Sequence, residues 1–493
     1  MDSDARRPMP KLSVFRNWLS LVGLVVVMGC LFAFVLLLAL DLLAPTANPY
    51  LGILAYLLVP AFLVLGLLML GVGLIIERRR IVRSSDGKAP PLLLVDFSHP
   101  HARRRLTVFV ASSVAFLLLV AVASYRSYHF SESAGFCGQT CHTVMQPEYA
   151  TYLHSPHARI SCAECHIGPG AAWYVKAKIS GLYQVYATTF NKFERPIRTP
   201  VRNLRPAQET CEQCHWPQKF AGNLERTYSH FLADKTNTPF TVRLLLKVGG
   251  GDPTQGPVGG IHWHMNVGNK VQYVAGDDLR QVIPWVRVTD PQGVVTEYMT
   301  PGFKPDPAKD VLHTMDCMDC HNRPAHIFRT PNDAVDLSMT LGKIDPTIPE
   351  IKKTALQVLT QTYTTEQDAM QKIATALHAK YDDGPRSRAA IDEAQQIYRG
   401  IFFPEMKTNW KVHPDNLGHK DSPGCFRCHD GNHKSADGKQ TVKANDCTAC
   451  HVIIAQGSGA KLQSLNPLGQ QFEHPGGDIG DMKCNECHNG ELQ

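Results

Sequence analysis

The residues of this chain best suited to chemistry are its cysteines, because nearly all stand in one repeated pattern with histidine. Of 15 cysteines among 493 residues, all but Cys30 occur in pairs followed directly by a histidine. Six pairs have the spacing C-x-x-C-H: Cys162, Cys165 and His166; Cys211, Cys214 and His215; Cys317, Cys320 and His321; Cys425, Cys428 and His429; Cys447, Cys450 and His451; Cys484, Cys487 and His488. The pair Cys137 and Cys141, before His142, has one extra residue between the cysteines.

This spacing is typical of haem c attachment. The two thiols form thioethers with the porphyrin, and the adjacent histidine binds the iron. Zinc ribbons also use C-x-x-C pairs, but they need no histidine after each second cysteine. Disulfides need no histidine at all. The pattern therefore predicts seven covalently bound haems, and a chain that carries a row of haems is expected to transfer electrons.

Each predicted haem also needs a sixth iron ligand or an open site. Two histidine ligands make a low-spin electron carrier, so histidines outside the motifs are candidates. We first choose the histidines that lie just before or after a motif. They are His326, His419, His433 and His474. His230, His262 and His264 come next; His262-Trp-His264 has strand spacing, which would turn both rings to one face, and one of them could serve the fourth haem.

Met145, shortly after His142, is predicted to be an axial ligand of the first haem. A thioether ligand raises the reduction potential of a haem. One alternative is a methionine that fills a gap in the core. The other is a first haem whose far face stays open.

Three apolar runs are long enough to cross a bilayer, which takes about 20 residues. They cover about 18–43, 50–76 and 106–124. The first is longer than a signal-peptide core of about 7–15 residues and another run follows it, so it is predicted to be an uncleaved anchor. Lysines and arginines precede the first run and separate the second from the third. The positive-inside rule therefore predicts a cytoplasmic N-terminus and an external chain from about residue 125.

The net charge of +6 comes from the lysines and arginines that flank the predicted spans. Residues 1–105 hold 12 Lys and Arg and 6 Asp and Glu, whereas the rest of the chain holds 38 of each. The positive balance therefore gives no indication of a nucleic-acid partner.

The elements that position the motifs are predicted to be mainly α-helical, with haem-packed irregular regions and a β-rich insertion. We expect a membrane domain with three transmembrane helices (1–124), a three-haem domain (125–235), a β-rich segment ending in the fourth haem (236–335), a helical segment (336–403) and a three-haem C-terminal domain (404–493). Alternating β-branched residues within 239–299 predict strands. Apolar residues at three-to-four spacing predict helices at Ile351–Tyr363, Glu366–Tyr381 and Arg388–Phe402.

One stretch resembles a known family. It contains Cys137-Gly-Gln-Thr-Cys-His-Thr-Val-Met145, Tyr152-Leu-His-Ser-Pro-His157, Cys162-Ala-Glu-Cys-His166 and Lys176-Ala-Lys178 leading to Gln184-Val-Tyr186. These residues resemble the NapC/NirT family of membrane-anchored multihaem quinol dehydrogenases. The resemblance implies that His157 is a distal ligand. It also implies a protein of the bacterial inner membrane, in contact with its lipid, that oxidises menaquinol or another quinol at the outer, periplasmic face. Electrons then pass to periplasmic cytochromes or a terminal reductase, as in a quinol:cytochrome c oxidoreductase.

The whole arrangement is similar to a narrower group. Three spans and seven haems, with a C-terminal Phe403-Pro-Glu-Met-Lys-Thr-Asn-Trp, resemble the heptahaem inner-membrane cytochromes of metal-reducing bacteria. This resemblance implies anaerobic respiration with electrons sent towards extracellular acceptors.

A quinol site needs a proton acceptor, because quinol oxidation releases protons and haem accepts only electrons. Lys176 or Lys178 is predicted to bind the quinol oxygen; the alternative is that both are interfacial lysines that extend towards water. Glu148 and Tyr152 are further candidates. Many family members carry an acidic residue after the Lys-x-Lys, whereas this chain has tyrosine and glutamine at 183–184.

Two other functions fit the motifs. A multihaem reductase of a nitrogen or sulfur oxyanion would need one open haem in a polar pocket. An electron-wiring subunit of a larger membrane complex would use the first two spans as a docking surface.

Overall fold

The computed structural model describes residues 17–43, 58–84, 100–140, 142–168, 171–201, 204–250, 259–266, 268–442, 447–480 and 482–492. The chain divides into two compact units, Met1–Thr140 and Cys141–Gln493. The division into five parts expected from the motif positions stays a prediction.

The first unit consists of long apolar helices. They are α1 (Trp18–Leu43), α3 (Val59–Ser84) and α4 (Pro100–Ser131), followed by the π-helical turn η3 (Phe136–Thr140). The first predicted span coincides with α1. The start of the second predicted span, residues 50–57, lies outside the described part; from Val59 the span is helical, and α3 continues beyond it through its arginines to Ser84.

Two helices of the described residues are long and apolar enough to cross a membrane, over Trp18–Leu37 and Val59–Arg83. The third predicted span lies inside α4, which is helical and continues to Ser131, but α4 is not among these two. Three spans were predicted, and two helices of the described residues qualify as candidate spans.

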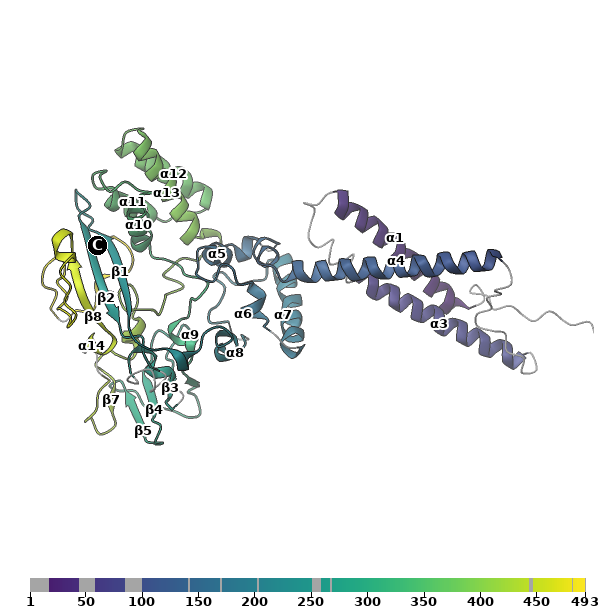
Figure 1. Cartoon of the computed structure of the whole chain (residues 1–493), viewed down its shortest axis with the longest axis horizontal. Helices are drawn as coiled ribbons and strands as arrows, with labels where there is room; N and C mark the ends of the chain where they lie inside the picture. The colour runs from purple at the N-terminus through teal and green to yellow at the C-terminus, as the bar shows by residue number, and fades with distance from the viewer. Residues whose placement is uncertain are drawn as a thin grey trace, which may run out of the picture. The chain divides into compact units, whose positions relative to one another are not determined.

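Small residues bring α1 and α3 together, and Figure 1 shows the two helices side by side. A Cβ atom on Gly23 would lie 2.6 Å from the backbone nitrogen of Leu70, and one on Gly73 would lie 2.7 Å from the backbone nitrogen of Ser20. Glycine at both positions lets the two backbones approach closely, as is common between membrane helices.

The second unit contains two antiparallel sheets. The first has the order β1-β2-β8, with β1 (Leu224–Phe231), β2 (Pro239–Leu246) and β8 (His451–Gly457). The second has the order β6-β3-β4-β5-β7, with β3 (Lys270–Val274), β4 (Trp285–Thr289), β5 (Val295–Met299), β6 (Leu312–Thr314) and β7 (Lys434–Ser435). Strands therefore form where alternation predicted them, but β8 joins the first sheet from near the C-terminus (Figure 1).

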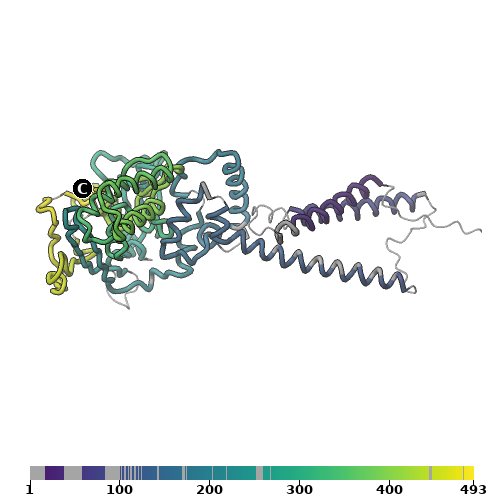
Figure 2. The backbone as a smooth tube through the Cα atoms, turned by 90° about the horizontal axis from the view of Figure 1, so that it is seen from above, coloured from purple at the N-terminus to yellow at the C-terminus, as the bar shows by residue number. Residues whose placement is uncertain are grey.

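Four helices without a haem motif pack around the largest hydrophobic core. They are α10 (Pro331–Thr340), α11 (Ile351–Leu359), α12 (Glu366–Lys380) and α13 (Pro385–Ile401), green in Figures 1 and 2. The apolar positions at helical spacing are the buried ones, among them Ile373, Leu377 and Ala394. The three helices predicted here are found, with ends that differ by a few residues.

The motifs lie on short helical pieces. The remaining α-helices are α5 (His142–Leu153), α6 (Cys162–His166), α7 (Ala171–Thr189), α8 (Ala207–Cys211), α9 (Cys317–Cys320), α14 (Cys447–Cys450) and α15 (Cys484–Cys487). The 3₁₀ turns are η4 (Pro217–Lys219), η5 (Ile261–Met265), η6 (Pro404–Met406), η7 (Gly424–Arg427) and η8 (Gly459–Leu462).

A buried ion pair ties β1 to α10 and α11. The Asp336 carboxylate accepts from Lys352 Nζ at 2.7 Å and from His230 Nδ1 at 3.0 Å, and only 5% of the Lys352 side chain and 3% of the Asp336 side chain are exposed. His230, Asp333 and Asp336 could together hold a metal ion by distance. However, Lys352 and Lys420 already neutralise the two carboxylates, so the group acts as a structural cluster.

We expect Asp336→Ala to destabilise the protein by about 3–5 kcal/mol, because it leaves the buried Lys352 charge without its partner. Thermal unfolding in detergent, followed by circular dichroism, measures the effect. The exposed pair Lys380–Glu350 provides the control, and Glu350→Ala should lower the stability far less, because solvent screens an exposed ion pair. Similar losses in the two variants would contradict the structural role of Asp336.

Candidate haem-binding sites

The regular motifs share a local geometry in which one helical turn connects the first cysteine to the histidine. In four of them, the backbone N–H of the histidine donates to the backbone carbonyl of the first cysteine at 2.7–3.0 Å. The histidines concerned are His215, His321, His429 and His488. One turn of helix brings residues four apart to the same side. The thiol and the imidazole can therefore reach one porphyrin.

The first motif has a different local structure. Cys137 lies on the π-helical turn η3, and a π turn holds one residue more than an α turn. This wider turn matches the extra residue of the motif. Cys141 and the side chain of His142 lie outside the described part, and Met145 is partly buried on α5.

Outside the first motif, every motif histidine faces a second histidine. Six ring pairs have centroids 5.9–6.3 Å apart. The pairs are His166 and His326, His215 and His157, His321 and His262, His429 and His264, His451 and His419, and His488 and His474.

The separation of these rings fits an iron atom between them. An imidazole nitrogen binds a metal at about 2.0–2.1 Å and lies about 1 Å from its own ring centroid, so two imidazoles on opposite sides of one iron have centroids about 6 Å apart. Direct packing of two rings could give one such distance by chance. Six pairs, each containing one motif histidine, fit haem with two histidine ligands.

Backbone carbonyls orient four of the non-motif histidines. The Nδ1 atoms of His157, His262, His264 and His326 lie 2.9–3.0 Å from backbone oxygens. A carbonyl only accepts, so Nδ1 carries the proton and Nε2 keeps its lone pair for a metal. His474 differs, because its Nδ1 accepts from the Gly476 N–H at 3.1 Å, so its ring proton lies on Nε2 and would have to leave that nitrogen before Nε2 could bind iron.

Burial favours the neutral form of several imidazoles in these pairs, and the neutral form is the one that binds iron. Burial lowers the pKa of His326 to about 4. It also lowers the pKa of His166, His264, His321, His419, His451 and His488.

His433 does not fit the predicted role of iron ligand. Its ring is fully buried, with Nδ1 2.8 Å from the Asp430 carboxylate and Nε2 2.7 Å from the Ile283 carbonyl. Both ring nitrogens therefore already have partners. His433 was predicted to be a ligand because it lies close to a motif in sequence. Closeness in sequence does not reveal the hydrogen bonds that already occupy its ring.

The local structure predicted for His262 and His264 was wrong. They lie on the 3₁₀ turn η5 and not on a strand. The rings consequently face two motifs, because His262 is stacked opposite His321 and His264 faces His429. Two histidines close together outside any motif were the available signal in the sequence.

Motifs that follow one another along the chain also lie side by side. The thiols that interact across neighbouring motifs are Cys165 and Cys214, Cys211 and Cys317, Cys320 and Cys425, and Cys447 and Cys484. The fifth and sixth motifs are joined differently. Phe426, inside the fifth, stacks on His419 at 4.2 Å, and His419 faces the sixth-motif histidine, His451. The second to seventh motifs therefore form one continuous series.

The predicted quinol residues lie on two helices of the second unit. Lys176 is exposed on α7, with its Nζ 4.6 Å from the centroid of the Trp173 ring, and Lys178 is half-buried on the same helix. Glu148 lies on α5, where burial raises the pKa of its carboxyl to about 7. The Tyr152 hydroxyl bonds to the carbonyls of Ala158 and Ile160, which gives Tyr152 a structural role beside His157.

One side of α7 is apolar and exposed. Its exposed residues include Val175, Ile179, Leu182, Tyr183 and Tyr186, and 73% of Leu182 is exposed. Their spacing at three and four residues places most of them on one helix face. An exposed apolar face of this length is typical of a surface that contacts a membrane or a partner.

Comparison with known proteins agrees with the motifs. The NapC/NirT cytochrome c family, N-terminal region, matches residues 99–199. Over 491 residues, 96% of this chain and 95% of the relative, the chain is 42% identical to cytochrome c-type protein ImcH of Geobacter sulfurreducens. It is 34% identical over 113 residues to cytochrome c-type protein NrfH of Wolinella succinogenes, which covers 22% of this chain and 62% of NrfH. No solved structure matches. The chain therefore belongs to the NapC/NirT family of c-type cytochromes, membrane-anchored proteins that act in electron transfer.

Proposed function

We propose that this protein is a seven-haem quinol dehydrogenase, which oxidises menaquinol or another quinol at the outer face of the inner membrane. Its haems then carry the electrons to a periplasmic cytochrome or reductase. The observation that carries this proposal is the series of six histidine pairs on neighbouring motifs. It supports a chain of low-spin electron carriers, because two histidine ligands leave an iron no open position.

The pairs support distal ligands for the second to seventh haems. In motif order, these ligands are His326, His157, His262, His264, His419 and His474. Met145 stays our proposal for the first haem.

The exposed face of α7 supports entry of quinol from the membrane. Tyrosine and tryptophan favour the bilayer surface, and so do lysines that extend towards water. A helix with this face would lie in the interface. Lys176 and Lys178 would then meet a quinol head group at that depth. Glu148, with its raised pKa, is our candidate for taking up a released proton.

We propose α4 as a third span. Lysines and arginines precede α1 and lie between α3 and α4, which favours a cytoplasmic N-terminus. With two spans alone, the chain would return to the cytoplasm after α3. A third crossing leads the haem motifs to the periplasm, where haem c is attached.

The reductase alternative is weaker, since a substrate-binding haem needs an open iron. Each motif histidine whose ring the structure describes faces a second histidine. The first motif, whose histidine ring lies outside the described part, follows α4 in the chain.

The test is anaerobic addition of a menaquinol analogue to the detergent-solubilised protein while the c-haem absorbance is followed. We expect rapid reduction of several haems and its loss with a quinol-site inhibitor. If quinol reduces no haem while dithionite reduces all of them, the protein is a wiring subunit that takes electrons from a partner.

A further inference from the structure

Arg323 and His413 form a polar pair in which one buried donor atom of each residue lacks an acceptor. Arg323 Nη2 donates to His413 Nδ1 at 2.9 Å and to the Thr199 hydroxyl at 3.0 Å. His413 is 1% exposed. Arg323 Nε and His413 Nε2 are both buried, and neither has a hydrogen-bond partner.

The bond from Arg323 determines the tautomer of His413. A guanidinium only donates, so Nδ1 must accept and the ring proton lies on Nε2. Burial lowers the pKa of His413 to about 3, so the ring is neutral. The Nε2–H group therefore points away from Arg323. Leaving a buried donor without a partner is costly, so the Arg323 Nε–H group indicates a missing acceptor.

The acceptor should be an anion, because the Arg323 guanidinium is charged and its hydrogen bonds among the described residues go to neutral groups, the Thr199 hydroxyl and the His413 ring. Glu148 and Asp415 lie near Arg323, but no hydrogen bond joins either carboxylate to it among the described residues.

The position of Arg323 in the sequence points to a haem propionate as the anion beside its guanidinium. Arg323 follows His321 of the fourth motif and precedes His326, which faces the second motif. Each haem in those motifs would carry two propionate carboxylates into this region.

We propose that Arg323, whose guanidinium is held by His413 and Thr199, binds a propionate of the second or the fourth haem. The assignment rests on the proposed haem chain, and it adds a residue that sets the potential of one carrier. A buried cation beside a propionate favours the electron-rich, reduced haem, and so raises its reduction potential. Glu148 is the competing acceptor, since its Oε2 atom is also buried without a partner.

The test compares four full-length variants: Arg323→Gln, Arg323→Lys, Glu148→Gln and, as control, Arg386→Gln. Arg386 is an exposed residue that pairs with Asp345 in the haem-free helices. Haem content is measured first. Redox titration is then combined with reduced-minus-oxidised infrared spectra of protein whose propionate carboxyl carbons carry ¹³C.

We expect Arg323→Gln to lower the potential of one haem and to shift one ¹³C-sensitive carboxylate band. Arg323→Lys keeps the charge and loses Nε, so it should shift the same band with a smaller change in potential. Arg386→Gln and Glu148→Gln should leave that band in place. Unchanged bands and potentials in both Arg323 variants would overturn the proposal. So would an affected band that is insensitive to ¹³C and disappears in Glu148→Gln, which would make Glu148 the acceptor. Quinol-driven reduction of the unmodified protein tests the proposed function separately.

Discussion

Replacing His264 with alanine is expected to change one haem of seven from low-spin to high-spin and to interrupt the electron path in its middle. His264 faces His429 with ring centroids 5.9 Å apart, and its Nδ1 is held by the Ile261 carbonyl. Alanine leaves the fifth iron with five ligands, which alters its spin state and its potential. Because the fifth motif lies between the fourth and the sixth, haems beyond it should then be reduced more slowly. A tenfold slowing would correspond to about 1.4 kcal/mol of added barrier.

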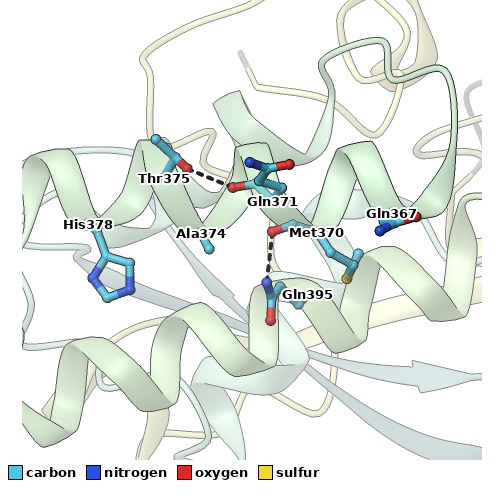
Figure 3. A pocket seen from close by; sticks show the side chains of 7 residues that line it. All are labelled: Gln367, Met370, Gln371, Ala374, Thr375, His378 and Gln395. Atoms are coloured by element: carbon cyan, nitrogen blue, oxygen red, sulfur yellow. Dashed lines mark hydrogen bonds between the residues drawn. The ribbon is translucent and has the colours of Figure 1, made fainter.

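Electron paramagnetic resonance at low temperature measures the spin state, and stopped-flow absorbance measures the reduction rates. His378→Ala is the matched control. His378 is exposed on α12, beside a shallow surface depression of the haem-free helices, and Figure 3 shows it there with Met370 and Gln395. The control should keep the low-spin spectrum. If His264→Ala also keeps it, His264 is not the ligand of the fifth haem.

The double substitution Lys176→Ala and Lys178→Ala is expected to slow quinol-driven haem reduction by about 10- to 100-fold. A hydrogen bond from a charged donor contributes about 1.5–3 kcal/mol, which corresponds to that range of rates. Dithionite needs no quinol site, so it should still reduce every haem at the original rate.

Lys192→Ala is the control for the lysines, since Lys192 is exposed just beyond the end of α7. It should leave both rates unchanged. Quinol kinetics that stay unchanged in the double variant would remove the two lysines from the quinol site, and would favour their role as interfacial residues.

Sequence reasoning worked best where the pattern is local. A cysteine pair and its adjacent histidine need one helical turn, so the haem motifs could be recognised without any knowledge of the fold. The helical periodicity of α11, α12 and α13 is equally local, and the ends of these helices were predicted within a few residues.

The distal ligands were harder to predict, because they depend on contacts between distant segments. His326 faces His166 and not the fourth motif, which it follows in sequence. His433 lies near a motif and yet is engaged by Asp430 and Ile283. The pairing of β2 with β8 is hidden in the same way. Spacing along a chain cannot reveal which lone pair is still available after folding.

The pairing of His166 with His326 has a consequence for biogenesis. In the proposed topology the chain enters the periplasm after α4, so the second motif would meet the haem-attachment machinery before residue 326 does. With His326 as its distal ligand, the second haem would be joined to its thiols early, but its coordination would be completed only when the middle of the chain has arrived. Maturation of this carrier would thus be coupled to export of the fourth motif. A truncated product that ends before residue 326 would carry a second haem with one histidine ligand.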